Sequence, residues 1–393
     1  MPTEATTPNE ATLCARAPMP AESSSRPLVP SIDLSVVFCP ADLDHVDALS
    51  DGKAAGFIYA RDGHPNAAQL ALKMARLEGA EAGVICASGM GAIASVFLTL
   101  LSQGDHVLLA KGTYGKTTAL VTRQLPRWGI NHDFFDASDA ASLGQGLKPK
   151  TRLVFVETVS NPLLRVADID TLAKLSREAG IPLAVDNTFA PLICRPIEHG
   201  ATLVIHSATK MIGGHSDLTL GVLVGPGELI EPTKVLASTL GQTGNPFESW
   251  LALRGLATLS VRMERASRNA LELARRFEKH GKVDRTFYPG LESHPEFAIA
   301  SKLLKGGFGA MVTIDLGTRE RAARLIRGLK GIPFAPSLGD VQTTLSHPAT
   351  TSHRGQDAQQ LAAQGMSEGM IRISVGLEEI EDLWGEFLVG LEN

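Results

Sequence analysis

The chain has 393 residues, of which 44% are hydrophobic and 20% charged, and its formal net charge is -5. A chain of this size can bury a large core, and we expect two domains and a tail. The slight negative charge and the aromatic content of 5% disfavour proteins that bind nucleic acid or acidic membranes. Small metabolites are therefore the expected partners.

Residues 1–30 are rich in Pro, Ser, Thr, Ala and Glu, a composition that predicts a disordered tail. They lack the basic segment and the apolar segment of a secretory signal. The four cysteines form no CxxC pair, and the 11 histidines show no metal-ligand spacing. We therefore expect a cytoplasmic protein with no structural metal. No apolar run reaches the roughly 20 residues that cross a bilayer, so no membrane association is expected.

From residue 81 onward, short β-branched runs alternate with amphipathic stretches, from "AGVICA" through "RLVFVET" and "PLAVDNT" to "TLVIHS". This alternation predicts an α/β fold with a mainly parallel central sheet. Unbroken apolar runs such as "RLVFVE" indicate strands that are buried on both faces. "LTLGVLVGP" is expected to be a further strand.

After about residue 250, a long helical stretch leads to strands such as "GAMVTIDL". This change of pattern predicts a smaller α+β C-terminal domain. We place the boundary near residue 255, which gives domains over residues 61–255 and 256–393.

The stretch "LVIHSATKMIGGHSD" places Lys210 just beyond the end of a buried strand, beside Ser207 and Thr209. Open α/β sheets bind their ligands at this edge. A partly desolvated lysine there can lose its proton near neutral pH and form a Schiff base with a carbonyl group. The sequence thus predicts a site for an aldehyde or a ketone.

Asp186 ends the strand "PLAVD", which should neighbour the strand before Lys210. A carboxylate there can keep a pyridine nitrogen protonated, as pyridoxal phosphate requires of its enzymes. The ordinary alternative for an aspartate at a strand end is a helix cap or a turn residue.

"CASGMGAIAS" places Ser88, Gly89 and Met90 between a strand and a helix. Backbone N–H groups at a helix start attract phosphate, and the hydroxyls of Ser207 and Thr209 would add donors from the other side. The alternative is that the glycine merely closes a βα turn. A nucleotide loop is disfavoured because neither GxGxxG nor Walker A is present.

Two further motifs, each with a tyrosine, contribute to the predicted cofactor site. Tyr114 in "KGTYGKTT" follows the strand "DHVLLA", where its ring could stack on a planar cofactor; the alternative is a structural tyrosine. "IYARDGHPN" carries Tyr59 and Arg61 in an extended segment that could reach a partner subunit. Arg61 could clamp a phosphate there, although a lone arginine is more often surface charge.

Together with "ETVSNPLLRVADI", "SLGDVQTTLSHPATTSH" and "MIRISVGLEEIEDL", these motifs make the chain resemble one family of pyridoxal-phosphate enzymes from about residue 30 to the end. It is the trans-sulfuration family of Cys/Met metabolism, which includes cystathionine γ-synthase, cystathionine γ-lyase, methionine γ-lyase and O-acylhomoserine sulfhydrylase. The resemblance implies an aminotransferase-like fold, known as fold type I. It also implies an N-terminal arm over residues 31–60 that contacts the neighbouring subunit. The assembly would be a homodimer at minimum and in most members a homotetramer.

The resemblance also implies individual roles. Lys210 would form the Schiff base with pyridoxal 5'-phosphate, Asp186 would pair with the pyridine nitrogen, and Tyr114 would stack on the ring and act as a general acid or base. Arg372 would bind the substrate carboxylate with Ser337 beside it. The other implied cofactor contacts are Ser88, Gly89, Met90, Ser207 and Thr209 near the phosphate, Asn161 near the ring oxygen, and Tyr59 and Arg61 reaching the phosphate of the neighbouring subunit.

Three positions depart from particular subclasses. Pro336 stands where cystathionine lyases and bacterial cystathionine synthases typically have a glutamate, and Ala119 stands where the lyases have an arginine. Lys116 stands where methionine γ-lyases usually have a cysteine. "SLGD" and "HPATTSH" resemble methionine γ-lyases and homoserine-ester sulfhydrylases more closely. The predicted reaction is therefore γ-elimination or γ-replacement on a sulfur amino acid or an O-acylhomoserine. The alternatives are a cystathionine γ-synthase or γ-lyase and, more distantly, an aminotransferase or a non-catalytic regulator that binds the cofactor.

Overall fold

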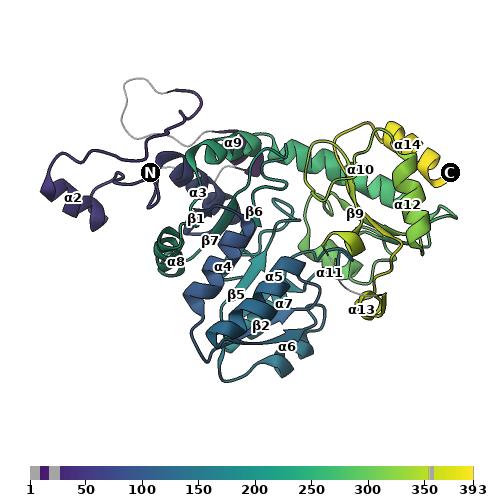
Figure 1. The fold of residues 1–393 in the computed structure, drawn as a ribbon, viewed down its shortest axis with the longest axis horizontal. Coiled ribbons are helices and arrows are strands. Elements are labelled where there is room, and N and C mark those ends of the chain that lie inside the picture. The colour runs from purple at the N-terminus through teal and green to yellow at the C-terminus, as the bar shows by residue number, and fades with distance from the viewer. Residues whose placement is uncertain (1–8, 17–26, 353, 355–357, 393) are drawn as a thin grey trace, which may run out of the picture.

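The computed structural model describes residues 9–16, 27–352, 354 and 358–392. A larger sheet flanked by helices is joined through the long helix α10 (Leu259–Glu278) to a smaller sheet near the C-terminus (Figure 1). No helix in this described part of the chain is long and apolar enough to span a membrane.

The larger sheet has seven strands in the order β1-β7-β6-β5-β4-β2-β3. Strand β7 runs antiparallel to both of its neighbours, and all other pairs are parallel, which confirms the predicted mainly parallel sheet. The strands are β1 Ala82–Cys86, β2 His106–Ala110, β3 Asn131–Phe135, β4 Thr151–Glu157, β5 Leu183–Asp186, β6 Leu203–Ser207 and β7 Gly221–Gly225.

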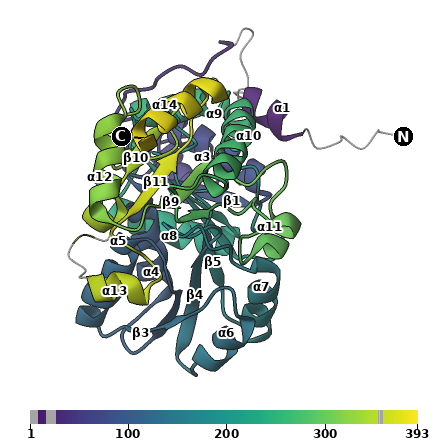
Figure 2. The same cartoon turned by 90° about the vertical axis from the view of Figure 1, so that its right-hand side faces the viewer.

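Helices cover both faces of this sheet (Figure 2). In strand β4, Leu153 and Phe155 pack into the core beneath one helical layer, whereas Val154 and Val156 pack into the core beneath the other. This two-sided burial explains the unbroken apolar run in the sequence. The first layer contains α4 Gly89–Leu100 and α8 Gly227–Thr239, and the second contains α3 Pro65–Glu78, α6 Ala140–Gly146, α7 Ile169–Glu178 and α9 Pro246–Leu256.

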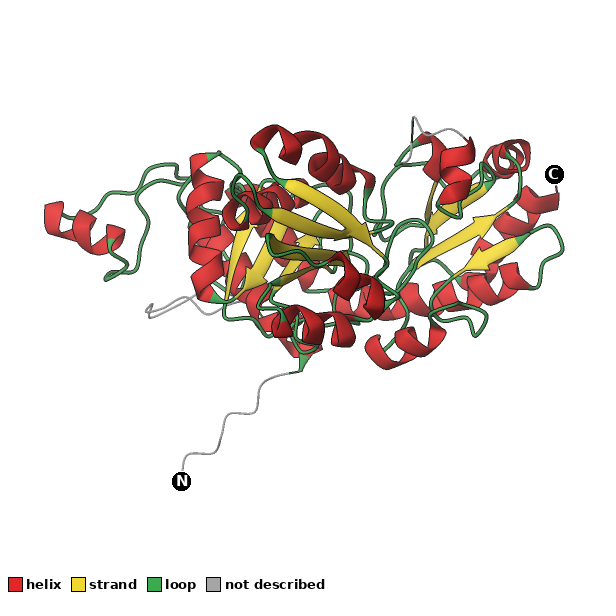
Figure 3. Ribbon diagram, turned by 90° about the horizontal axis from the view of Figure 1, so that it is seen from below, coloured by secondary structure: helices red, strands yellow, loops and turns green. Residues whose placement is uncertain are grey.

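The smaller sheet lies toward the C-terminal end of the molecule, beside the larger one (Figure 3). It is antiparallel, with the strand order β10-β11-β9-β8. Helices α10, α12 and α14 pack on it and bury a separate apolar core. The strands are β8 Arg285–Phe287, β9 Met311–Asp315, β10 Thr344–Ser346 and β11 Met370–Ser374. The helices after α10 are α11 Phe297–Leu303, α12 Arg319–Gly328, α13 Ala358–Ala363 and α14 Ile380–Glu392.

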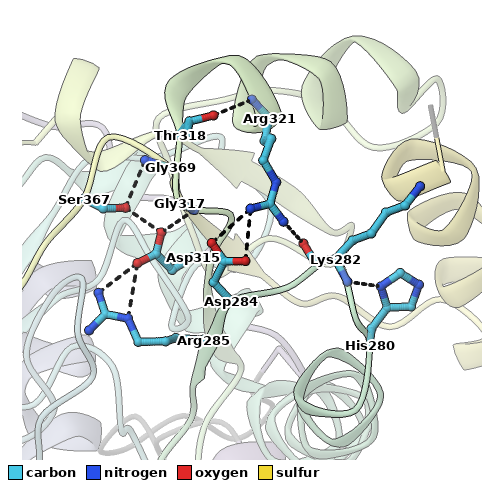
Figure 4. A network of polar contacts seen from close by, with 10 residues as sticks. All are labelled: His280, Lys282, Asp284, Arg285, Asp315, Gly317, Thr318, Arg321, Ser367 and Gly369. Atoms are coloured by element: carbon cyan, nitrogen blue, oxygen red, sulfur yellow. Dashed lines mark hydrogen bonds and ion pairs between the residues drawn. The ribbon is translucent and has the colours of Figure 1, made fainter.

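A buried carboxylate ties the end of β9 to its neighbours (Figure 4). Asp315 Oδ2 accepts a hydrogen bond from Arg285 Nη2 on β8 at 2.8 Å, while Asp315 Oδ1 accepts from the Gly317 amide at 2.9 Å and from Ser367 Oγ at 2.5 Å. Ser367 lies just before β11. The network therefore fixes the start of the strand that carries Arg372 toward the larger sheet.

The predicted tail over residues 1–30 is wrong for residues 9–16. They include helix α1 (Glu10–Ala15), whose Cys14 side chain is fully buried. Asn9 caps the helix by accepting the Ala11 amide at 2.9 Å, and Lys73 Nζ donates to the Cys14 carbonyl at 2.5 Å. Composition alone missed this helix because one buried side chain and a few polar contacts hold it. Residues 1–8 and 17–26 lie outside the described part of the chain.

The long helical stretch predicted after about residue 250 is two helices. Helix α9 ends at Leu256, and α10 begins at Leu259. The boundary placed near residue 255 falls in the last turn of α9, and the division into domains there stays a prediction.

The segment before α3 extends away from the body of the molecule, with helix α2 (Leu43–Ser50) at its far end (Figure 1). Its apolar side chains are exposed in the single chain, and contiguous exposed apolar surface is typical of an interface. These exposed residues are Leu28, Val29, Ile32, Leu34, Val36, Val37 and Leu43. The contact of this arm with a second subunit stays a prediction.

Candidate active site

A cavity of about 840 Å³ lies at the carboxyl edge of the larger sheet and is closed on one side by β11. Strands β1, β4, β5 and β6 all end at this cavity, so short loops bring chemically active side chains together. The sequence-predicted residues that line it are Ser88, Gly89, Met90, Tyr114, Asn161, Asp186, Ser207, Thr209, Lys210 and Arg372. Ser337 lies between two lining residues, Pro336 and Leu338.

Lys210 lies in a turn that follows β6, where its amide donates to the Ser207 carbonyl at 3.1 Å. Its Nζ has one long contact, 3.4 Å to Ser337 Oγ. Burial and the positive charge of Arg372 lower the pKa of Lys210. A larger share of the amine is therefore neutral near physiological pH, which makes it a better nucleophile and base.

The turn that carries Lys210 is held from the C-terminal side by Arg262 on α10. The guanidinium donates to the carbonyl oxygens of Met211 at 2.7 Å and Ile212 at 3.1 Å. It also donates to the Gly255 carbonyl at 2.8 Å. A buried cation thus satisfies three backbone acceptors and fixes the backbone that follows the lysine.

Asp186 ends strand β5, beside β6 in the sheet. Its Oδ1 accepts hydrogen bonds from the Thr188 amide at 3.0 Å and the Thr188 hydroxyl at 2.5 Å. The Thr188 hydroxyl in turn accepts the Ser207 amide at 2.8 Å, so one side chain links the two strand ends. Burial raises the pKa of Asp186.

Glu157 is a second buried carboxyl group, and no sequence motif predicted a role for it. It pairs in register with Asp186 across β4 and β5, and its Oε1 accepts the Tyr114 amide at 2.6 Å. Burial and the nearby Asp186 raise the pKa of Glu157 well above its usual value. Its position at the end of the apolar run "RLVFVE" was the available signal, since a carboxylate there faces the same edge as Asp186.

The start of α4 faces the end of β6 at close range. Ser88 caps the helix by accepting the Gly91 amide on its Oγ at 3.0 Å. A Cβ atom at Gly89 would lie only 2.8 Å from the Ser207 Cβ, so no larger residue fits without displacement. The amides of Gly89 and Met90 in the first helical turn need acceptors from outside the helix, which suits an anion.

Tyr114 lies at the start of α5 (Gly115–Ala119), which continues as a π-helical turn (Leu120–Gln124) and a 3₁₀ turn (Leu125–Trp128). Its side chain is partly exposed in the cavity wall. Burial raises the pKa of its phenol, against the opposing influence of Arg372. The phenol therefore keeps its proton at neutral pH.

Arg372 reaches the cavity from β11 in the smaller sheet and is almost fully buried. Its Nη1 donates to Asn161 Oδ1 at 3.0 Å, and its Nη2 donates to the Ser337 carbonyl at 3.2 Å. Its buried Nε has no partner among the described residues. Burial lowers the pKa of Arg372 to about 10, which still leaves the guanidinium charged at neutral pH.

Tyr59 and Arg61 do not reach this cavity in the single chain. The Arg61 guanidinium lies 5.5 Å from the centre of the Tyr59 ring, and Arg61 lines a separate hollow beside α3 and β1. Tyr59 itself is 41% exposed. A role in the cavity of a neighbouring subunit stays a prediction.

The donors and acceptors in the cavity fit the parts of pyridoxal phosphate. The helix start beside Ser207 and Thr209 suits its phosphate, the Asp186 carboxylate suits a protonated pyridine nitrogen, and the Lys210 amine suits its aldehyde. The unpartnered Nε of Arg372 suits a carboxylate of an amino-acid substrate. Such a set is typical of the lysine-dependent pyridoxal-phosphate enzymes.

Residues 11–392 match the family described as Cys/Met metabolism PLP-dependent enzymes, and the chain belongs to this family. O-succinylhomoserine sulfhydrylase of Pseudomonas aeruginosa is 40% identical over 342 residues, 86% of this chain and 85% of that protein. L-methionine gamma-lyase of Fusobacterium nucleatum is 40% identical over 344 residues, with 86% and 87% of the chains covered. Cystathionine beta-lyase of Bacillus subtilis is 41% identical over 337 residues, with 85% and 86% covered.

A crystal structure of a candidate O-acetylhomoserine (thiol)-lyase of Campylobacter jejuni superposes with a TM-score of 0.93 at 27% identity. It covers 98% of this chain and all of that one, and it carries N'-pyridoxyl-lysine-5'-monophosphate. The predicted family, the aminotransferase-like fold and the dependence on pyridoxal phosphate are thereby confirmed.

Proposed function

We propose that this chain catalyses γ-elimination or γ-replacement on a sulfur amino acid or an O-acylhomoserine. The observation that carries the proposal is the convergence of Lys210, Asp186, Tyr114 and Arg372 on one cavity. The relatives, a methionine γ-lyase and a homoserine-ester sulfhydrylase, support this reaction class. We assign to Lys210 the bond to the cofactor.

Arg372 binds the substrate α-carboxylate in this proposal. The guanidinium is charged, is held in place by Asn161 and the Ser337 carbonyl, and has Nε available. A charge-assisted hydrogen bond to a carboxylate in this buried site would fix the orientation of the amino acid. The α-carbon would then lie near Lys210.

Lys210 and Tyr114 move protons. The lowered pKa of Lys210 suits it to take the proton from the substrate α-carbon and to return it at a neighbouring carbon. Bound pyridoxal phosphate supplies the electron sink for the negative charge that this proton leaves behind. The Tyr114 phenol, whose pKa is raised by burial, remains protonated and serves as the acid that assists departure of the γ-substituent.

A cystathionine γ-synthase or γ-lyase is the second candidate, supported by a relative described as cystathionine gamma-lyase of Bacillus subtilis, which is 38% identical over 344 residues. The side chain of Pro336 counts against it. This residue lines the cavity, and its side chain offers no acceptor for the distal ammonium group of cystathionine.

The test is a substrate panel with the cofactor-loaded protein. Methionine, cystathionine, O-acetylhomoserine and O-succinylhomoserine are each incubated with and without sulfide or cysteine, and 2-oxobutanoate, ammonia and thiol products are measured. We expect a γ-product from at least one substrate and none from the Lys210→Ala variant. A keto acid formed only in the presence of an amino acceptor would instead identify an aminotransferase. Absence of any turnover would favour a regulator that binds the cofactor.

We also infer a homodimer at minimum, and a homotetramer as its full assembly, in the cytoplasm. The exposed apolar residues of the arm support an interface between chains. Light scattering of the purified protein measures the assembly, and a monomer at micromolar concentration would contradict it.

A further inference from the structure

The described residues that line the cavity include three exposed cations in addition to Lys210 and Arg372. They are Lys116, Arg123 and Arg354. None of the three has a side-chain hydrogen bond or ion pair within the described part of the chain. Like charges gathered without a counterion repel one another, and the repulsion is relieved when an anion binds between them.

Lys116 and Arg123 lie on the same helical segment. Lys116, Ala119 and Arg123 all line the cavity, and their spacing of three and then four residues puts them on one face of the helical segment that begins at Gly115. The methyl group of Ala119 leaves room between the two longer side chains. An anionic group can therefore contact both of them.

The third cation comes from a different part of the chain. A Cβ atom at Gly115 would lie 2.6 Å from the Ser352 carbonyl oxygen, so the segment before Arg354 approaches the start of α5 closely. Two separate segments thus supply positive charge to the same mouth of the cavity.

Among the described residues that line the cavity, no acidic side chain is free to offset this charge. Glu157 and Asp186 are the acidic residues among the described lining, and both have other partners. Glu157 accepts the Tyr114 amide, and Asp186 accepts from Thr188. The described part of the mouth therefore attracts an anion and offers no available carboxylate to a distal ammonium group.

We propose that Lys116 and Arg123, assisted by Arg354, bind a carboxylate on the leaving group of the substrate. The site would then prefer a γ-substituted amino acid with an anionic tail, as in a succinyl ester, over one with a neutral tail, as in methionine or an acetyl ester. The inference rests on the proposed function, because Arg372 is taken to hold the α-carboxylate at the other end of the same substrate.

O-succinylhomoserine and O-acetylhomoserine provide a matched pair of substrates, since they share the amino acid and the γ-ester and differ in the charged tail. With the cofactor-loaded protein and sulfide, we expect kcat/KM for the succinyl ester to exceed that for the acetyl ester by about tenfold or more, the worth of one charge-assisted hydrogen bond. Addition of salt should reduce the ratio, because screening weakens exposed charges.

Single substitutions distinguish an effect of this subsite from an effect of positive charge elsewhere on the surface. Arg123→Gln should lower the succinyl-to-acetyl ratio of kcat/KM by about tenfold, and Lys116→Gln should lower it in the same direction. Arg127→Gln is the matched control. Arg127 is an exposed arginine on the same helical segment that does not line the cavity, and its loss should leave the ratio unchanged.

The outcomes distinguish the inference from the proposed function. Equal use of the two esters would overturn the subsite while leaving γ-chemistry intact. If no substrate of the panel reacts, the proposed function fails. If the two esters alone do not react, or if nothing reacts, calorimetric titration of both esters into the cofactor-loaded Lys210→Ala variant still decides the subsite. Equal affinities in that titration would also overturn it, whereas tighter binding of the succinyl ester that is lost in Lys210→Ala/Arg123→Gln would support it.

Discussion

Glu157 is a buried carboxyl group that contacts two other parts of the candidate active site. It ends the buried strand β4, lies in register with Asp186, and holds the backbone amide of Tyr114. Two carboxylates side by side in a buried site cannot both be ionised at low cost. The proposed pairing of Asp186 with the pyridine nitrogen of the cofactor requires a charge on Asp186, so the neutral form is the one expected at Glu157.

This protonation state can be tested through stability. The pKa of Glu157 in the folded chain lies above its unfolded value, so its contribution to stability is fully present below about pH 4 and is lost as pH rises toward the raised pKa. Glutamine mimics the neutral acid and does not titrate. Both proteins are compared without cofactor. We therefore expect the melting temperature of Glu157→Gln minus that of the wild type to increase as pH rises from about 5 to about 8.

A glutamate elsewhere supplies the control for this comparison. Glu231→Gln, on the exposed side of α8, should show no gain that grows with pH. If the difference between Glu157→Gln and the wild type stays constant across the range, folding does not raise the pKa of Glu157, and the neutral form assigned to this residue is wrong.

The close approach of α4 to β6 is the element-scale feature on which the proposed phosphate site depends. The first residues of the helix and the last residue of the strand contact each other without an intervening side chain, because position 89 is glycine. An anion placed there contacts helix amides on one side and hydroxyl groups on the other.

Gly89→Ala should therefore weaken cofactor binding. The added methyl group would lie 2.8 Å from the Ser207 Cβ and 3.2 Å from its backbone Cα, so the helix start must move. A dissociation constant for pyridoxal phosphate raised by about tenfold or more is expected from strain of this kind. Absorbance titration of the cofactor-free protein measures it.

Gly144→Ala is the corresponding control for a helical glycine. A Cβ atom there meets nothing within 4 Å, so the substitution should leave the affinity for the cofactor as it is in the wild type. Equal affinity in Gly89→Ala as well would show that the phosphate does not lie at the start of α4.

Strands that are marked by a continuous run of apolar residues were predicted correctly from the sequence. The apolar runs "RLVFVE" and "PLAVD" are the buried strands β4 and β5, because burial on both faces leaves an unmistakable composition. The short helix α1 was missed, since a single buried cysteine and a cap are invisible in a polar, proline-rich segment. The interruption between α9 and α10 was missed because neither proline nor glycine marks residues 257 and 258.

At the scale of the whole molecule, residues from both sheets line the cavity. Lys210 and Asp186 could be predicted together because the carboxyl ends of neighbouring parallel strands meet at one edge. Arg372 arrives from β11, and only the family resemblance connected it with them. Glu157 and Arg123 were assigned no role, since a glutamate at a strand end and an arginine on a helix have many ordinary uses.

Whether Tyr59 and Arg61 act in the active site of a neighbouring subunit can be tested with hybrid assemblies. Both lie outside the cavity of their own chain. If Arg61 contacts the phosphate in a neighbouring subunit, then co-expressed Arg61→Ala and Lys210→Ala chains should form hybrids with one intact site. Activity should then exceed that of either variant alone, measured on the same amount of purified protein. A mixture no more active than the better variant would show that Arg61 does not act across an interface.

Reduction with borohydride followed by peptide mapping tests the central claim most directly. The cofactor-loaded protein is expected to absorb near the violet end of the visible spectrum and, after reduction, to carry pyridoxyl phosphate on the peptide that contains Lys210. The Lys210→Ala variant should retain no such label. Stable attachment of the cofactor to a different lysine, or to none, would contradict the account.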